Sequence, residues 1–200
     1  MASRLDDLRL HIEHLERELD EELREARARW RYRIDRGRVR FEREARQAQR
    51  RLKQRVPSFL RESQPLNALT APMIYSLVVP IALLDLWLSV YQAVCFRMYG
   101  IARVRRSAYV VIDRHHLAYL NGIEKLNCVY CSYANGVFAY AREIAGRTEQ
   151  YWCPIKHAKR PRATHGHYRD FVDFGDAAGY KKALLRLRAE LQPKPPADGK

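Results

Sequence analysis

Three cysteines and one histidine in the C-terminal half of the chain stand at spacings that metal sites use. Cys128 and Cys131 form a Cys-x2-Cys pair, and Cys153 and His157 follow 21 residues later as Cys-x3-His. Three thiolates and one imidazole can close a tetrahedral zinc site, and soft thiolates also suit an iron–sulfur cluster. The pattern therefore predicts a metal centre, with zinc as the first interpretation and an iron–sulfur cluster as the alternative.

Two other interpretations of the same thiols remain open. Cys128 and Cys131 could form a redox dithiol, because neighbouring cations lower the pKa of a thiol. Thiols can also be inert, small apolar side chains. The N-terminus is charged and shows no secretory signal pattern, so we expect reduced thiols and no disulfide framework. Two further histidine pairs are expected to be polar surface groups or hydrogen-bonded groups, with a second metal site as the alternative: His115-His116 and His165-Gly166-His167.

A helix is expected to position the Cys-x2-Cys pair. Asn121 is a favourable N-cap, and Glu124 three residues later matches a capping box. Residues three apart lie on one helical face, so both sulfurs could reach one ion. Asn135-Gly136 is a potential break in this helix. A second, amphipathic helix is expected over Asp176–Leu191.

Residues 72–96 are the most apolar stretch of the chain, with a single carboxylate, Asp85, and neither Lys nor Arg. A spanning helix needs about 20 predominantly apolar residues, so we expect this segment to insert in lipid. Pro80 is expected to kink the helix. A charge at Asp85 is costly in lipid unless the carboxyl is neutral, paired or hydrated. Cys95, at the end of the segment, is expected to be inert or acylated.

Basic residues flank the apolar segment on both sides and leave its topology open. The positive-inside rule favours a cytoplasmic C-terminal part, because the C-terminal flank is denser in Arg. A crossing would then place a long charged arm on the opposite side. A re-entrant helix kinked at Pro80, with both ends in the cytoplasm, is the alternative. The basic residues of the C-terminal flank are Arg97, Arg103, Arg105, Arg106 and Arg114.

The N-terminal arm carries an apolar stripe over residues 8–59 at spacings of four, three and four. Its eleven-residue repeat, about 3.67 residues per turn, is typical of a nearly straight helix or a weakly right-handed supercoil. A helix of about 50 residues needs a partner for such a stripe, so we predict a homo-oligomeric coiled coil through residues 8–59, with the membrane surface as the alternative. Gly37 is a potential bend. The repeat includes Ile12, Leu23, Ile34, Ala45 and Val56.

Charge divides the same arm into two halves. Residues 1–25 hold nine acidic residues and four arginines, whereas residues 26–61 hold fourteen basic and three acidic residues. The basic half lies nearer the apolar segment and suits anionic headgroups. The acidic half is more suited to a protein partner.

The expected fold is therefore mainly α-helical. Its parts are a charged amphipathic or coiled-coil helix over 1–61, a linker over 62–71, a transmembrane or re-entrant helix over 72–96, a small helical Cys/His domain next to the membrane over 97–192, and a disordered tail over 193–200.

The stretch LNCVYCSYANGVFAYAREIAGRTEQYWCPIKHA, residues 126–158, resembles a segment of uncharacterised small bacterial membrane proteins. The resemblance covers about a sixth of the chain. It implies a bacterial origin and carries no assigned activity. Together with the apolar segment, a bacterial origin leads us to expect a protein of the inner membrane.

The net charge of +14 suits anionic partners, and the apolar segment favours lipid headgroups over nucleic acid. The sequence has no phosphate-binding glycine loop, nucleophile elbow or His-Glu-x-x-His helix, so it shows no catalytic function. We expect a membrane-anchored structural or adaptor protein with a zinc site. A membrane redox protein and a basic membrane protein that contacts nucleic acid are the alternatives.

Overall fold

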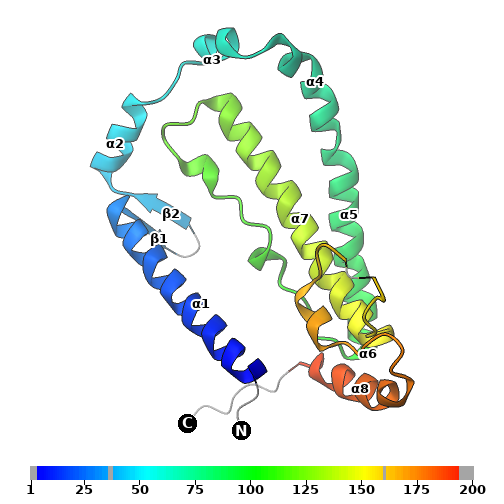
Figure 1. The fold of residues 1–200 in the computed structure, drawn as a ribbon. Coiled ribbons are helices and arrows are strands. Elements are labelled where there is room, and N and C mark those ends of the chain that lie inside the picture. Colours follow the sequence, from blue (N-terminus) through cyan, green and yellow to red (C-terminus); the bar gives the residue numbers. More distant parts are fainter. Residues whose placement is uncertain (1–3, 36–37, 160, 194–200) are drawn as a thin grey trace. The chain divides into compact units, whose positions relative to one another are not determined.

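The computed structural model describes residues 4–35, 38–159 and 161–193, without the side chains of residues 4–9, 13 and 38. Gly37, residues 194–200 of the tail and the side chain of Leu8 therefore lie outside the described residues. The chain is mainly helical, as predicted (Figure 1). It divides into two compact units, Met1–Gln64 with Asp113–Val129 and Pro65–Ile112 with Tyr130–Lys200.

The first unit begins with helix α1 (Arg4–Arg29) and continues into a β-hairpin. Strands β1 (Tyr32–Asp35) and β2 (Arg38–Phe41) pair antiparallel. Two short helices follow, α2 (Arg43–Arg51) and α3 (Val56–Glu62). The prediction of one continuous helix over residues 8–59 is therefore wrong beyond Arg29.

A local change in the apolar period explains the hairpin. Tyr32 and Ile34 in β1, and Val39 and Phe41 in β2, alternate with charged residues, which is the two-residue period of a strand. Tyr32 lies opposite Phe41, with ring centroids 5.4 Å apart. Arg31, which follows α1, has a φ of 54°, in the left-handed region that helices avoid. Ile34 and Phe41 also fit the eleven-residue repeat, so the repeat alone could not distinguish the two structures.

The predicted apolar stripe survives on α1, where it is exposed. Ile12, Leu15, Leu19 and Leu23 recur at spacings of three and four residues and are 44–59% exposed. The described part of this unit does not cover them, so the stripe is accessible to a partner.

The second unit is built on a long apolar helix, Pro65–Tyr99, of 35 residues. By length and composition this helix could cross a membrane, and only 11% of its most apolar window is buried. Pro80 lacks the N–H that would bond one turn back, and the α-helix is interrupted nearby at Leu77. The helix consists of α4 (Pro65–Ser76), α5 (Val78–Tyr91), a π-helical turn η1 (Gln92–Phe96) and α6 (Arg97–Tyr99).

Helix α7 (Gly122–Trp152) lies beside this long helix and runs in the same direction (Figure 1). Ile81 packs with Ala134 and Val137 in one buried cluster. Phe96 packs with Tyr140 and Ile144, further along both helices, in the other. The connecting segment must therefore return the chain from the end of the long helix at least as far as the level of Ile81.

The predicted start of α7 is confirmed by its hydrogen bonds. The Asn121 side chain accepts from the backbone N–H groups of Ile123 and Glu124 at 2.9 and 3.0 Å. The Glu124 carboxylate accepts from the Asn121 N–H at 2.8 Å, which completes the capping box. The predicted break at Asn135-Gly136 does not occur, because α7 is continuous to Trp152.

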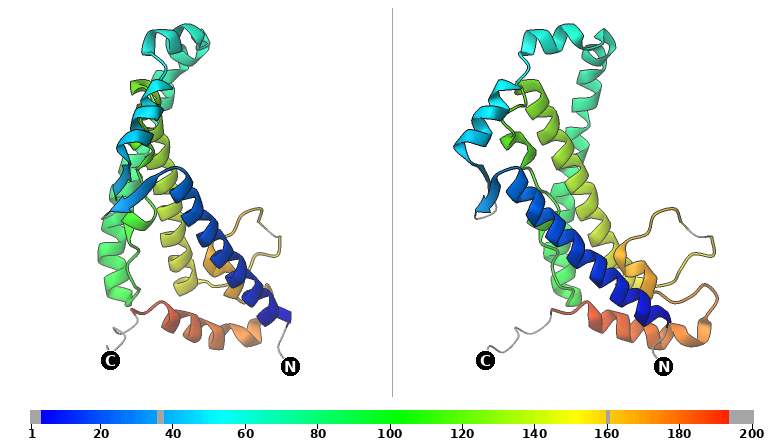
Figure 2. Two further views of the ribbon diagram at one scale, coloured as in Figure 1. Left: turned by 90° about the vertical axis from the view of Figure 1, so that its left-hand side faces the viewer. Right: turned by 60° about the vertical axis from the view of Figure 1, so that its left-hand side comes forward.

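Helix α8 (Ala177–Glu190) closes the second unit, close to the predicted bounds, with Asp176 as its N-cap. Figure 2 shows α8 lying across the end of α7. Gln150 donates to the Leu187 carbonyl at 2.8 Å, and Arg188 donates to the Tyr151 carbonyl at 2.7 Å. Three short 3-10 helices complete the described elements: η2 (Arg106–Ala108), η3 (Arg114–His116) and η4 (Gly166–Asp170).

Candidate functional site

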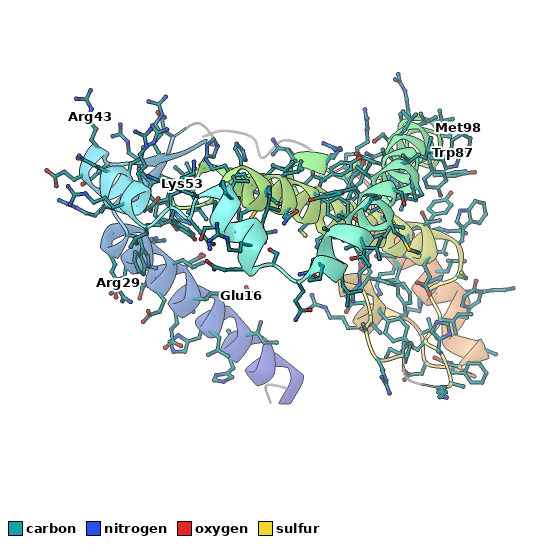
Figure 3. All side chains as sticks on the ribbon, turned by 90° about the horizontal axis from the view of Figure 1, so that it is seen from above. Glu16, Arg29, Arg43, Lys53, Trp87 and Met98 are labelled. Carbon is teal, nitrogen blue, oxygen red and sulfur yellow. The ribbon has the colours of Figure 1, made fainter. Side chains whose placement is uncertain are left out.

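Helix α5 and its continuation η1 present two different faces. Ile81, Asp85, Gln92 and Phe96 are buried and recur at helical spacing along the face toward α7. The opposite face, here called the outer face, is entirely apolar and exposed. Figure 3 places Trp87 and Met98 on the side of the helix away from α7. The outer face comprises Val79, Leu83, Leu86, Trp87, Val90, Val94 and Met98.

This arrangement reverses the pattern of a helix in a water-soluble protein. There the apolar residues face the core and the polar residues face water. Here the polar side chains of Asp85 and Gln92 point inward, while Trp87 on the outer face is 72% exposed. A contiguous exposed apolar surface of this kind marks a site of contact with lipid or protein.

The carboxylate of Asp85 is hydrogen-bonded on the face toward α7, here called the inner face. Arg106 donates to it from Nη2 at 2.6 Å and from Nε at 2.9 Å, a two-pronged ion pair. Tyr133 of α7 donates its hydroxyl to the same carboxylate at 3.0 Å. Asp85 therefore joins α5 to α7 and to the chain between them.

Gln92 joins the same three elements seven residues further along the helix. Its side-chain carbonyl accepts from the Val104 N–H at 2.9 Å, and its amide donates to the Val104 carbonyl at 3.4 Å. The amide also donates to the hydroxyl of Tyr140 on α7. Gln92 is only 3% exposed, so these bonds satisfy a buried amide that would otherwise be costly.

The segment Gly100–Ile112, here called the strap, runs between these contacts and crosses α7 at Gly136. A Cβ at Gly136 would lie 2.7 Å from the Val110 Cα and 2.9 Å from the Tyr109 carbonyl oxygen. Only glycine allows the strap to approach α7 this closely. Gly136 is thus a packing residue within a continuous helix, which explains why the expected break is absent.

The structure does not bring the four predicted metal ligands together within one chain. Cys131 lies on α7 and Cys153 just beyond its end, and 22 residues of helix separate them by about 33 Å. His157 follows in the next loop, where its ring stacks on Tyr168. Cys128 lies one turn before Cys131, and all four cysteines of the chain are free. Among the described residues, no group of three or more His, Cys, Asp or Glu side chains could hold a metal ion.

The histidine pair His165 and His167 occupies a place that the sequence did not indicate. The Nε2 atom of His165 lies 2.8 Å from a Glu149 carboxylate oxygen, and that of His167 lies 3.2 Å from Glu143. Both glutamates belong to α7. Of the two expectations for this pair, the structure shows hydrogen-bonded groups that dock a loop on the helix.

Gly146 makes this docking possible. A Cβ at Gly146 would lie 2.7 Å from His165 Nδ1, so a larger residue would push the ring away from α7. Arg147 also donates to Glu143 at 2.8 Å. The hydrogen bond from His167, together with that from Arg147, lowers the pKa of Glu143 to about 2 against the opposing effect of burial. A glycine between two glutamates on one helix was the available signal in the sequence.

The first unit contains a half-open cavity of about 600 Å³ that the sequence also did not indicate. The side chain of Gln49 on α2 accepts from the Ala118 N–H at 3.0 Å and holds residues 113–119 against the hairpin and α2. The aromatic lining comes from Trp30, Tyr32, Phe41 and Tyr119. Aromatic and aliphatic lining with few polar groups is typical of a binding groove.

Comparison of the chain with protein-family models, with curated proteins and with solved structures finds no match. The resemblance of residues 126–158 to bacterial membrane proteins therefore stays a prediction.

Proposed function

We propose that this chain is a membrane-anchored structural or adaptor protein, held to lipid by the outer face of α5. The observation that carries the proposal is the orientation of α5, with its polar side chains inward and an uninterrupted apolar face outward. Moving such a surface from water into an apolar environment gains roughly 25 cal/mol for each Å² buried.

Lipid is the proposed contact because charge and apolar surface lie close together. Arg97 is exposed next to Met98 at the end of the outer face, and Arg103 and Arg105 of the strap are exposed. Cations beside an apolar helix attract anionic headgroups, and the net charge of +14 acts in the same direction. The aromatic rings of Tyr99 and Trp152, 5.3 Å apart at this end of the helix, are of the kind enriched at membrane interfaces.

The adaptor part of the proposal rests on the first unit. Its α1 stripe is exposed, and the aromatic groove beside the hairpin is open. Both are surfaces that a protein partner would cover. We propose that the α1 stripe pairs with a second copy of the chain as a coiled coil.

Flotation of the purified full chain with vesicles of 75% phosphatidylcholine and 25% phosphatidylglycerol tests the anchor. We expect wild type to float and to resist extraction by alkaline carbonate. Leu86→Glu with Val90→Glu should lower the floated fraction at least about tenfold, because charges on the lipid face are costly. Leu86→Ala with Val90→Ala, which keeps the face uncharged, is the control and should still float.

A wild-type chain that remains soluble and monodisperse without lipid or detergent would contradict the proposal. Circular dichroism of the two double variants separates loss of lipid contact from loss of fold. If the glutamate variant is helical and floats like wild type, the outer face is not the anchor.

A further inference from the structure

We infer that the helix Pro65–Tyr99 lies along one leaflet, with its outer face in lipid, and does not cross the bilayer. The inference rests on the proposed function, since it specifies how the same outer face meets the membrane. Sequence alone left a crossing and a re-entrant helix open. The strap and the inner face of α5 distinguish these from a helix that lies in the plane of the membrane.

The irregular backbone of the strap is evidence against a crossing. Apart from η2 its backbone is irregular, and irregular backbone is tolerated at membrane depth only where protein or a water-filled cavity surrounds it. Several strap residues are exposed, including Arg103, Arg105 and Arg106. Lipid on all sides of the α5–α7 pair would therefore contact bare peptide groups and arginines.

The strap lies beside the middle of the long helix and not at one end. Arg106 binds Asp85, and Val104 binds Gln92. Asp85 comes 20 residues after Pro65 and 14 before Tyr99. A crossing helix would thus bring the strap arginines into the bilayer interior, where Arg is among the most costly residues.

The charged residues of helix α7, which packs on the inner face, are also evidence against a crossing. Ile144 packs in one cluster with Phe96, and Tyr91 shares a hydrogen bond with Thr148 at 3.1 Å. The charged residues of this stretch, Glu143 and Arg147, therefore lie at the level of the last turns of the predicted membrane segment. A bilayer around both helices would have to bury them.

The length of the exposed apolar surface is also evidence against a crossing. Exposed apolar side chains recur from Leu66 through Met73 and Trp87 to Met98. At 1.5 Å per residue this is about 48 Å, well beyond the roughly 30 Å of the hydrocarbon core. A helix that lies in the plane of one leaflet can place this whole length in lipid while the strap, α7 and the arginines stay at the headgroups and in water.

A depth profile of three exposed positions tests the inference. Met73, Trp87 and Met98 are 79%, 72% and 75% exposed, so they form a matched set along the helix. Starting from the full chain with Trp30→Phe and Trp152→Phe, Trp87 is kept, or is replaced by Phe while tryptophan is placed at Met73 or Met98. Quenching by lipids brominated at different depths in the vesicles described above then gives the depth of each position.

We expect the three tryptophans to lie at the same shallow depth. A crossing or re-entrant helix would instead place Trp87 deepest, by about 15–20 Å relative to both ends for a straight crossing. That profile would overturn the inference and leave the lipid anchor intact. A protein that neither floats nor is quenched, and that elutes as a dimer, would overturn both and assign the outer face to a second copy.

A second measurement does not depend on depth. In a chain with its four cysteines replaced by serine, Gln64→Cys and Ser107→Cys place single thiols before the helix and on the strap. We expect a membrane-impermeant maleimide added outside sealed vesicles to label both. Labelling of only one until the vesicles are opened would show a crossing and overturn the inference. The tryptophan profile keeps the native cysteines, so it decides the question if the cysteine-free chain does not fold.

Discussion

The guanidinium of Arg106 holds the carboxylate of Asp85 through three hydrogen bonds of 2.6, 2.9 and 3.2 Å, although Asp85 belongs to the most apolar helix of the chain. The Asp85 side chain is 11% exposed, whereas the Arg106 side chain is 44% exposed. The pair therefore sits at the border between the inner face and water, where an ion pair is partly screened.

Removal of Arg106 alone should be more harmful than removal of both charges. Arg106→Ala leaves Asp85 buried and unpaired, and we expect a loss of about 2–3 kcal/mol in the free energy of unfolding. Asp85→Asn combined with Arg106→Ala should recover at least about 1 kcal/mol of this loss. Chemical unfolding in mild detergent, followed by circular dichroism, measures both. Equal losses for the single and the double variant would contradict this, because the unpaired Asp85 carboxylate would then cost nothing.

Gly136→Ala should destabilise the second unit by about 1–3 kcal/mol. Its Cβ would meet the backbone of the strap at 2.7 Å, and backbone cannot move aside as a flexible side chain can. Gly122→Ala is the matched control, because a Cβ there meets nothing within 4 Å and alanine favours helix. We expect the control to be neutral or slightly stabilising. Thermal unfolding of the two variants side by side gives the comparison.

The Glu143 pair predicts a specific loss of stability in acid. Its pKa in the folded chain is about 2, below the ordinary value of 4.5. The ion pair therefore contributes fully above pH 4.5, and its contribution is lost as the pH falls toward 2. We expect Glu143→Gln to lower the free energy of unfolding by about 1–2 kcal/mol at pH 6, a modest loss because solvent screens part of the interaction. At pH 2 the same substitution should have little effect.

Glu190 provides the control for this pH dependence. It pairs with Arg186 on the exposed side of α8 at 2.7 Å, and exposed pairs contribute little. Glu190→Gln should change stability by less than about 0.5 kcal/mol at pH 6. If both variants show the same small effect at pH 6, Glu143 does not hold the histidine loop on α7.

The α1 stripe predicts self-association. Leu15→Lys with Leu19→Lys should reduce the molar mass measured by light scattering toward that of one chain, because charges replace the apolar seam. Glu16→Gln with Asp20→Asn changes the net charge by the same amount outside the stripe and should leave the mass unchanged. A wild-type chain that is monomeric in detergent at all concentrations would contradict the proposed coiled coil.

Metal analysis of anaerobically purified protein tests the predicted metal centre of three cysteines and one histidine. The separation of Cys131 and Cys153 along α7 leads us to expect no stoichiometric zinc or iron on a single chain. Cys153→Ser should then leave the metal content unchanged. About one zinc per chain, lost in this variant, would show that ligands from two chains or a rearranged loop build the site. A brown, bleachable chromophore would point to the iron–sulfur cluster instead.

Features set by local chemistry could be predicted from sequence. The Asn121 capping box depends on residues three apart, and the apolar run of 72–96 needs only composition. The hairpin was not predicted, because a single apolar position such as Ile34 can fit both the period of a helix and the period of a strand. The partners of Asp85 and Gln92 could not be predicted, because they depend on how the strap crosses two parallel helices. The docking of His165 on Gly146 is non-local in the same way.

The parallel course of α5 and α7 has a consequence for synthesis of the chain. Tyr133 follows Asp85 by 48 residues and Arg106 follows it by 21. At 5–20 residues per second, about 2–10 s pass between the appearance of the carboxylate and that of its hydroxyl partner. Arg106 is made before Tyr133, so the carboxylate lacks both partners only in the first part of this interval, whereas the face toward α7 stays uncovered until α7 itself is made. The face of the long helix toward α7 is covered only once translation has passed Tyr140 and Ile144.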